Sequence, residues 1–277
     1  MRSDERTLEW WAVSLPRLSK LTAIQTISSH ERTQWSALFR DVPALRTCVA
    51  SVLEGRCGRL LTGPGANGTA WIEALPFLFP AGNVEGSVAE AFLESVGEAG
   101  GVVVGTERWL VEIERHCAGR TLRTPRTPYS AEGLDVGHLQ SLATRADEDT
   151  EIVRMDEELA RLAVTEIDPD LVFPGSFSEP RAFAADGVGF CVLRQGRPVS
   201  AATSAFVSSD AIEVQVNTHP GHRNCGLATK ASAALLTWCL EHGLTPGWDT
   251  GDEASRQLAR RLGYRELPGY EMLVVAP

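Results

Sequence analysis

A short run of basic and small residues is the part of this sequence best suited to chemistry. Within HPGHRNCGLAT (219–229), Arg223, Gly226 and Ala228 follow an alternating strand pattern, AIEVQV, and precede an apolar helical pattern. The first amides of a helix have no partner inside the helix and lie at the positive end of its dipole. Small residues let an anion approach those amides, so the run predicts a pyrophosphate site. An ordinary helix start after a glycine is the alternative interpretation.

Two further segments share their pattern with a known family. The spacing Arg223-x-x-Gly226-x-Ala228 after a strand resembles the acyl-coenzyme A turn of the GCN5-related N-acetyltransferase (GNAT) superfamily. Downstream, GDEASRQLARRLGY resembles that superfamily's second landmark, a helix that ends in Leu-Gly-Phe or Leu-Gly-Tyr. Together with GFCVLRQGRPVSAATSAF, these segments resemble the branch typified by the zwittermicin A resistance acetyltransferase. The resemblance holds from about Phe173 onward and fades upstream.

The resemblance implies acetyl-coenzyme A (acetyl-CoA) as the cosubstrate and assigns residues to it. A peptide-like pantetheine arm can pair with a strand whose backbone groups are free, and Val216, Asn217 and Thr218 stand where the superfamily does this. The pyrophosphate would then contact Arg223, Asn224, Cys225, Gly226, Leu227, Ala228 and Thr229. We expect Cys225 to contribute its backbone amide; a nucleophilic role would need an activated thiolate, which nothing in the sequence indicates.

Catalysis on an amine needs a general base, because an alkyl ammonium is mostly protonated at neutral pH. Glu213 is the candidate, since the superfamily often places a carboxylate on this strand; a solvent-facing or ion-paired glutamate is the alternative. Many members carry an acid tyrosine where this chain has Ala259, so Tyr264 and Tyr270 are possible stand-ins, although Tyr264 holds a packing position. Asp252 is a further catalytic candidate, and Asp252 and Ser255 are expected to contact the cofactor arm or the amine.

Composition limits the class of partner. The formal net charge of −10 and the pI near 5.2 argue against a nucleic-acid partner and would attract a cationic substrate such as an amine, or simply aid solubility. The six cysteines form no CxxC pair, the histidines have no metal spacing, and the amino terminus has no apolar signal segment. We therefore expect a reduced cytoplasmic protein without metal or membrane span.

Length and pattern predict two domains. The 277 residues exceed the usual single-domain size, and a Pro-rich break at RTLRTPRTPYSAEG places a boundary near Thr127, as a linker or an edge strand. Residues 1–127 predict an α/β lobe, proposed as a degenerate GNAT-like half, and 128–277 the acetyltransferase domain. In the latter we expect an antiparallel meander followed by strand, helix and strand, and a short helix capped by Ser178. The fold class is α/β (α+β), with a mixed, mostly antiparallel GNAT-like sheet flanked by helices.

These observations predict an N-acetyltransferase that acts on a primary amine of a small molecule, and the resemblance suggests an antibiotic or an amino metabolite. The missing tyrosine motivates an alternative, a non-catalytic acyl-CoA sensor. A second alternative keeps the enzyme but makes a protein amino terminus or lysine the acceptor. The amino-terminal lobe would complete the acceptor pocket, form a homodimer surface or repeat the same fold.

Overall fold

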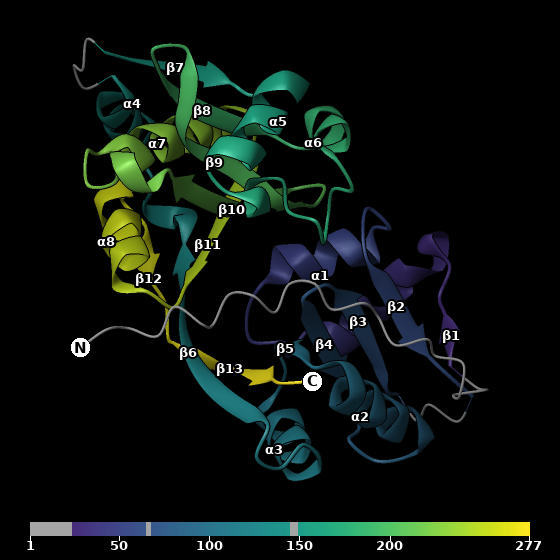
Figure 1. Cartoon of the computed structure of the whole chain (residues 1–277). Coiled ribbons are helices and arrows are strands. Elements are labelled where there is room, and N and C mark those ends of the chain that lie inside the picture. The colour runs from purple at the N-terminus through teal and green to yellow at the C-terminus, as the bar shows by residue number, and fades with distance from the viewer. Residues whose placement is uncertain (1–23, 65–67, 145–148) are drawn as a thin grey trace. The chain divides into compact units, whose positions relative to one another are not determined.

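The computed structural model describes residues 24–64, 68–144 and 149–277 of the chain (Figure 1). These residues divide into two compact units, each formed by more than one stretch of chain. Unit 1 holds the residues up to Pro43 together with 58–124 and 271–277, and unit 2 holds 44–57 and 125–270. The main division therefore lies between Thr124 and Pro125. Segment 44–57 lies between two stretches of unit 1 in sequence but belongs to unit 2, and segment 271–277 follows unit 2 but belongs to unit 1.

Unit 1 is a mostly antiparallel sheet with helices. Its strand order is β1-β2-β3-β4-β5-β13, in which only the β4–β5 pair is parallel. The strands are β1 (Gln25–Thr26), β2 (Arg59–Thr62), β3 (Ala70–Ala74), β4 (Phe77–Ala81), β5 (Gly101–Val103) and β13 (Tyr270–Val275), of which Glu271 and the residues after it belong to unit 1. The helices are the 3₁₀ segment η3 (Ser29–Phe39), α2 (Ser87–Ala99) and α3 (Glu107–His116).

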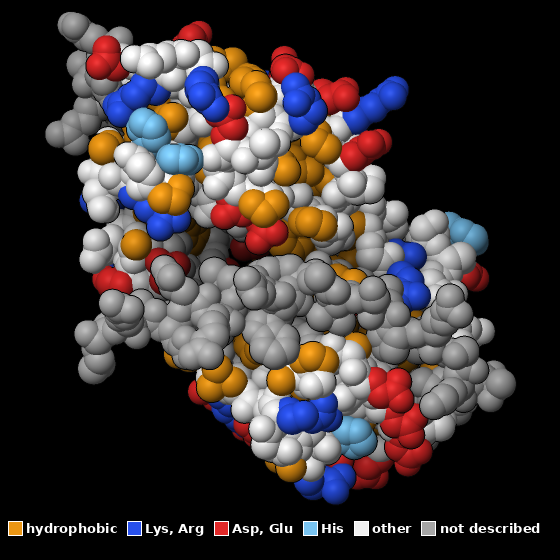
Figure 2. All heavy atoms as spheres, in the orientation of Figure 1, with side chains coloured by type: hydrophobic (Ala, Val, Ile, Leu, Met, Phe, Trp, Pro, Cys, Tyr) orange, Lys and Arg blue, Asp and Glu red, His pale blue; other side chains and the backbone are white. Residues whose placement is uncertain are grey.

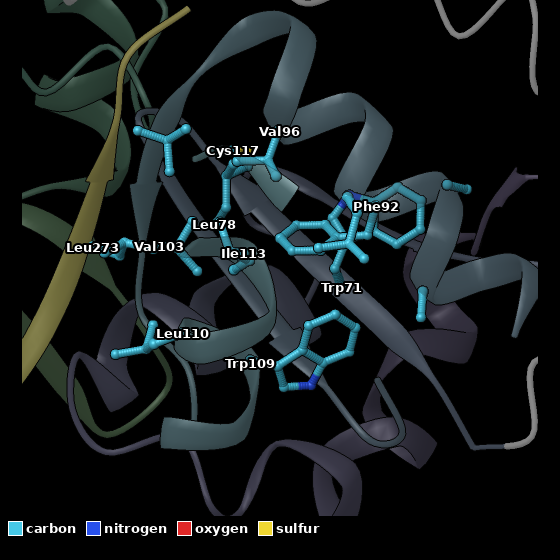
Figure 3. Close-up of a cluster of buried hydrophobic side chains, with 14 of the residues drawn as sticks. Trp71, Leu78, Phe92, Val96, Val103, Trp109, Leu110, Ile113, Cys117 and Leu273 are labelled. Atoms are coloured by element: carbon cyan, nitrogen blue, oxygen red, sulfur yellow. The ribbon is translucent and has the colours of Figure 1, made fainter. Parts of the chain in front are cut away.

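Aromatic side chains hold unit 1 together. Figure 3 shows the rings of Trp71, Phe92 and Trp109 gathered between β3, α2 and α3; the ring centroids of Phe92 lie 5.6 Å from Trp71 and 5.4 Å from Trp109. Aromatic pairs favour tilted and edge-to-face geometries at these distances. Leu273 of β13 is fully buried in the same cluster, so the last strand of the chain completes this core.

Unit 2 is an antiparallel meander extended by one parallel strand. Its strand order is β6-β11-β10-β9-β8-β7, with β12 beside β6. The strands are β6 (Thr121–Ser130), which belongs to this unit from Pro125 on, β7 (Thr150–Arg154), β8 (Gly189–Arg194), β9 (Arg197–Val207), β10 (Ala211–Thr218), β11 (Thr245–Thr250) and β12 (Arg265–Glu266). Only β10 and β11 run parallel, as a strand–helix–strand connection requires. The predicted mixed, mostly antiparallel sheet flanked by helices is confirmed.

Helices cover both faces of the sheet of unit 2. The α-helices are α1 (Arg46–Leu53), α4 (Val136–Ala143), α5 (Glu157–Glu166), α6 (Pro180–Asp186), α7 (Leu227–Glu241) and α8 (Glu253–Leu262). Short 3₁₀ turns are η4 (Ala131–Gly133), η5 (Pro169–Leu171) and η6 (Pro220–His222). α7 packs on the face that carries Val192, Ala202 and Ile212, whereas α5 and α6 pack on the face of Cys191 and Ala201. Neighbouring strand residues point to opposite faces, so Glu213 lies on the face opposite α7.

Two local predictions need correction. The Pro-rich segment is neither a linker nor an edge strand: it forms β6, whose Tyr129 pairs with Trp248 of β11 on one side and with Glu266 of β12 on the other. Ser178 does not cap α6; the N-cap is Glu179, without a side-chain cap, because Pro180 occupies the first helical position and fixes the start of the helix.

No described helix is both long and apolar enough to cross a membrane.

Candidate active site

The strands β10 and β11 separate part of the way along their length. They pair in parallel at three positions, from Ala211 to Glu213 on β10, and then β11 turns to pair with β6 instead. β10 continues along β9 to Thr218, and its register with β9 shifts between Glu213 and Val214, where a bulge bends the strand. Past Glu213, β10 thus has β9 on one side and no β11 pairing on the other. The predicted pantetheine positions, Val216, Asn217 and Thr218, lie on this open stretch.

The predicted phosphate turn follows directly. After η6, Asn224 and Gly226 adopt left-handed backbone conformations, with φ of 62° and 77°, and Gly226 is the N-cap of α7 without a side-chain cap. A Cβ at Gly226 would meet nothing within 4 Å. The backbone conformation, rather than crowding, therefore calls for glycine here, and an uncapped helix start leaves amide donors available for an anion.

Basic side chains surround the turn. Arg223 is exposed and its Nε donates to the carbonyl of Thr218 at 3.2 Å, while a guanidinium nitrogen of Arg194 lies 3.3 Å from Nδ1 of His222. Figure 2 shows Lys, Arg and His side chains gathered over the part of unit 2 where β10 leads into α7. Positive charge and free amides together suit a pyrophosphate.

The remaining predicted contacts of the turn differ in exposure. Asn224 and Cys225 are exposed, Ala228 is half-buried and Leu227 is buried in the core of unit 2. Thr229 is buried, and its hydroxyl accepts from Arg261 of α8 at 3.3 Å. Leu227 and Thr229 therefore offer a ligand their backbone amides rather than their side chains.

A buried carboxyl group lies at the point where β10 and β11 separate. Glu213 is 9% exposed, and an added Cβ on its strand neighbour Gly247 would come within 2.7 Å of Glu213 Oε2. The absent side chain of Gly247 is thus what leaves room for this carboxyl group. Burial, followed by the charge of Asp249, raises the pKa of Glu213 to about 8, and Arg126 partly opposes the rise.

Asp249 is the second carboxyl group at this point. It stands two residues after Gly247 on β11, so it points to the same face as the Glu213 carboxyl group. Arg126 of β6 donates from Nε to Asp249 Oδ1 at 2.6 Å, and a second guanidinium nitrogen donates to the Asp249 carbonyl at 3.1 Å. Burial raises the pKa of Asp249, whereas Arg126 and the nearby Tyr270 hydroxyl lower it.

The structure places the other predicted catalytic residues outside this pair. Asp252 is the N-cap of α8, its Oδ1 accepting from the amide of Ser255 at 2.8 Å, and the Ser255 hydroxyl accepts from Trp248 Nε1 at 3.2 Å. Tyr264 is buried in the core; its hydroxyl donates to the Pro246 carbonyl at 3.1 Å, and burial raises its pKa. Ala259, where the superfamily often has tyrosine, is fully buried in the same core.

Sequence reasoning missed Asp249 and Arg126. The alternation of TPGWDT on β11 could have indicated that Gly247 and Asp249 share a face, next to the strand of Glu213. Arg126 could not have been found, because it lies 123 positions from its partner. Among the described residues there is also no cluster of histidine, cysteine and carboxylate side chains that could hold a metal ion.

Comparisons with known proteins agree on one family. The family model described as GNAT acetyltransferase matches residues 36–273. A GCN5-related N-acetyltransferase-like protein from Streptococcus suis 89/1591 is 27% identical with a TM-score of 0.76, over 90% of this chain and 100% of that chain. A GCN5-related N-acetyltransferase from Kribbella flavida has a similar fold, with 18% identity and a TM-score of 0.57 over 86% of this chain and 97% of that one.

A curated relative matches over a shorter segment. The uncharacterized N-acetyltransferase YdfB of Bacillus subtilis (strain 168) is 33% identical over 90 residues, which are 32% of this chain and 34% of that protein. The match thus spans about a third of the relative's length.

Proposed function

The chain belongs to the GNAT acetyltransferase family, a family of acyltransferases, and from this premise we propose that it transfers an acetyl group from acetyl-CoA to a primary amine of a small molecule. The observation that carries the proposal is the separation of β10 and β11, with an uncapped helix start at one end of the open stretch and a buried carboxyl group at the other.

The cofactor fits along this open stretch. The backbone of Val216 to Thr218 pairs with the peptide-like pantetheine arm as another strand would. The amides that follow Asn224 and the charge of Arg223 receive the pyrophosphate. The thioester then reaches the region of Glu213 and Gly247, where the two strands meet.

Glu213 is proposed as the base. The ionised carboxylate removes one proton from the acceptor ammonium, and the neutral nitrogen attacks the thioester carbonyl carbon. A C–N bond forms, the C–S bond breaks, and the coenzyme A thiolate takes the second proton from the nitrogen. Tyr264 and Asp252 remain proposals for supporting roles, although the Tyr264 hydroxyl already donates to Pro246. A coenzyme A thiolate also leaves without an acid.

The acceptor class rests on two observations. The acidic pair Glu213 and Asp249 and the net charge of −10 favour a cationic amine. The resemblance to the zwittermicin A resistance branch supports an antibiotic or amino metabolite over a protein. Six free cysteines support a reducing compartment such as the cytoplasm.

Thiol release tests the proposal. Purified protein, acetyl-CoA and a panel of primary amines are expected to release free coenzyme A. Glu213→Gln should lower turnover while the affinity for acetyl-CoA, measured by calorimetry, stays the same. The matched control is Glu241→Gln, because Glu241 is exposed at the end of α7.

Other outcomes point elsewhere. Tight binding of acetyl-CoA with no thiol release on any small amine or peptide would indicate the non-catalytic sensor. Release on peptides alone, with the modified residue located by mass spectrometry, would make the acceptor a protein amino terminus or lysine. A protein that ignores acetyl-CoA altogether would refute the proposal.

A further inference from the structure

Asp249 is a buried carboxylate with one oxygen left over. Its side chain is only 4% exposed, and Oδ1 is held by Arg126, yet Oδ2 is buried and receives no hydrogen bond of good geometry from the described residues. The hydroxyl of Tyr270 is likewise buried without a partner of good geometry, although it lies close enough to Asp249 to lower the pKa of that carboxyl group. Leaving a buried carboxylate oxygen unpaired is costly.

A second buried carboxylate shows that this chain can avoid that cost. Glu73 in unit 1 is also 4% exposed, but both of its oxygens have donors. Arg59 donates to Oε2, and Trp71 Nε1 donates to Oε1 at 3.0 Å. Asp249 therefore differs in that its Oδ2 has only the imperfectly oriented Tyr270 hydroxyl nearby and, among the described residues, receives no hydrogen bond of good geometry.

We propose that Oδ2 of Asp249 binds the ammonium group of the acceptor at the meeting point of β10 and β11, and that this contact selects amines that are cations in solution. The inference rests on the proposed function and names the group that recognises its substrate. Arg126 favours the ionised form of Asp249 and fixes the residue in place, with one hydrogen bond to Oδ1 and one to the backbone carbonyl. The Tyr270 hydroxyl provides a second polar contact beside it.

In this proposal the two carboxyl groups, Glu213 and Asp249, have different roles. Before the amine arrives, Glu213 holds a proton at neutral pH, and Arg126 favours the charged form of Asp249 against the effect of burial. The ammonium at Asp249 favours the ionised form of Glu213, so the Glu213 proton leaves to solvent. Glu213 then accepts one ammonium proton, and the neutral nitrogen attacks the thioester as described above. Asp249 holds the nitrogen and exchanges no proton, so it is a binding residue rather than the base.

The test compares two acceptors of the same size and shape. One is a basic primary amine; the other is its aminooxy analogue, whose nitrogen is neutral at the assay pH. Asp249→Asn should raise KM for the cationic amine about tenfold or more, because a charged hydrogen bond is lost. KM for the neutral analogue and for acetyl-CoA should change less than about twofold, on the same reasoning. Asp186→Asn is the control, since Asp186 is exposed at the end of α6.

A measurement on the wild-type chain tests the same proposal without depending on whether the variant folds. A tertiary amine of the same shape, which cannot be acetylated into a stable amide, should compete with the acceptor, whereas its neutral carbon isostere should not. Equal inhibition by the two compounds would overturn the proposal, as would equal loss of both acceptors in Asp249→Asn.

The inference and the proposed function fail separately. If the wild type acetylates amines but shows no preference for the cation, only the inference is wrong. If it acetylates nothing, calorimetry of the tertiary amine with the coenzyme-loaded wild type and Asp249→Asn still decides: binding that depends on Asp249 supports the cation site, and absence of binding refutes it.

Discussion

Glu213 shows how burial sets the protonation of a single group. Its pKa is raised to about 8, first by burial and then by the charge of Asp249, so the carboxyl group is mostly protonated at pH 7. A general base must be ionised, so kcat/KM for the amine should rise with pH and level off above about pH 8. In Glu213→Gln, turnover should fall roughly a hundredfold or more and the rise near pH 8 should disappear. An identical rise in the variant would show that another group titrates.

The same carboxyl group affects stability. The folded pKa lies above the value near 4.5 expected for the unfolded chain, so the folded protein holds a proton that the unfolded chain releases. Stability from this group is complete below about pH 4.5 and is lost as the pH rises through 8, at about 1.4 kcal/mol per pKa unit. Urea unfolding at pH 5, 6.5 and 8 should therefore show a steeper loss for wild type than for Glu213→Gln. Parallel losses would argue against a raised pKa.

Gly247 controls the position of that carboxyl group. A Cβ there would lie 2.7 Å from Glu213 Oε2 and 3.2 Å from the carbonyl oxygen of Ile212. The side chain of Glu213 must move to relieve the contact, so Gly247→Ala should lower kcat about tenfold or more, as misplacement of a catalytic group does. Steady-state kinetics should show KM for acetyl-CoA unchanged. A kcat equal to that of wild type would mean that the exact position of Glu213 is unimportant.

At the scale of elements, the turn into α7 can be tested with a matched pair of glycines. Gly226 and Gly196 both have φ of 77°, and a Cβ at either would meet nothing within 4 Å. Alanine at each should cost about 1–2 kcal/mol of stability, since both require the left-handed conformation. Only Gly226→Ala should weaken acetyl-CoA binding in calorimetry, because Gly196 lies in the β8–β9 turn. Equal weakening in both variants would count against the phosphate turn.

The elements that sequence could predict are those built from local pattern. The meander, α7 and α8 followed from strand alternation, helical spacing and the glycines at their ends. The opening between β10 and β11 was expected only through the family resemblance. The Arg126–Asp249 ion pair and the pairing of β6 with β11 join residues that are far apart in sequence. Local sequence pattern does not indicate such pairings.

At the scale of the whole molecule, the division into units does not follow the order of the chain. Residues 44–57, which include α1, belong to unit 2 with Glu213, and β13 belongs to unit 1. Buried Cys48 of α1 lies close enough to Glu213 for their charges to interact. A cut near Thr127 would therefore remove α1 from the unit that holds the candidate site. The sequence pattern predicts one boundary between two continuous domains. Composition does not indicate that a short segment of one half of the chain packs in the other unit.

The place of β13 leads to a prediction that compares two buried leucines. Leu273 of β13 is fully buried in the aromatic core of unit 1, and Leu236 of α7 is fully buried in unit 2. Each leucine-to-alanine change should cost about 2–5 kcal/mol, through lost burial and the cavity left behind. Hydrogen exchange should then speed up in α2 and α3 for Leu273→Ala, and in α4 and α8 for Leu236→Ala. Because Leu273 follows unit 2 directly in sequence, faster exchange in α8 rather than α2 would contradict the assignment of the last strand to unit 1.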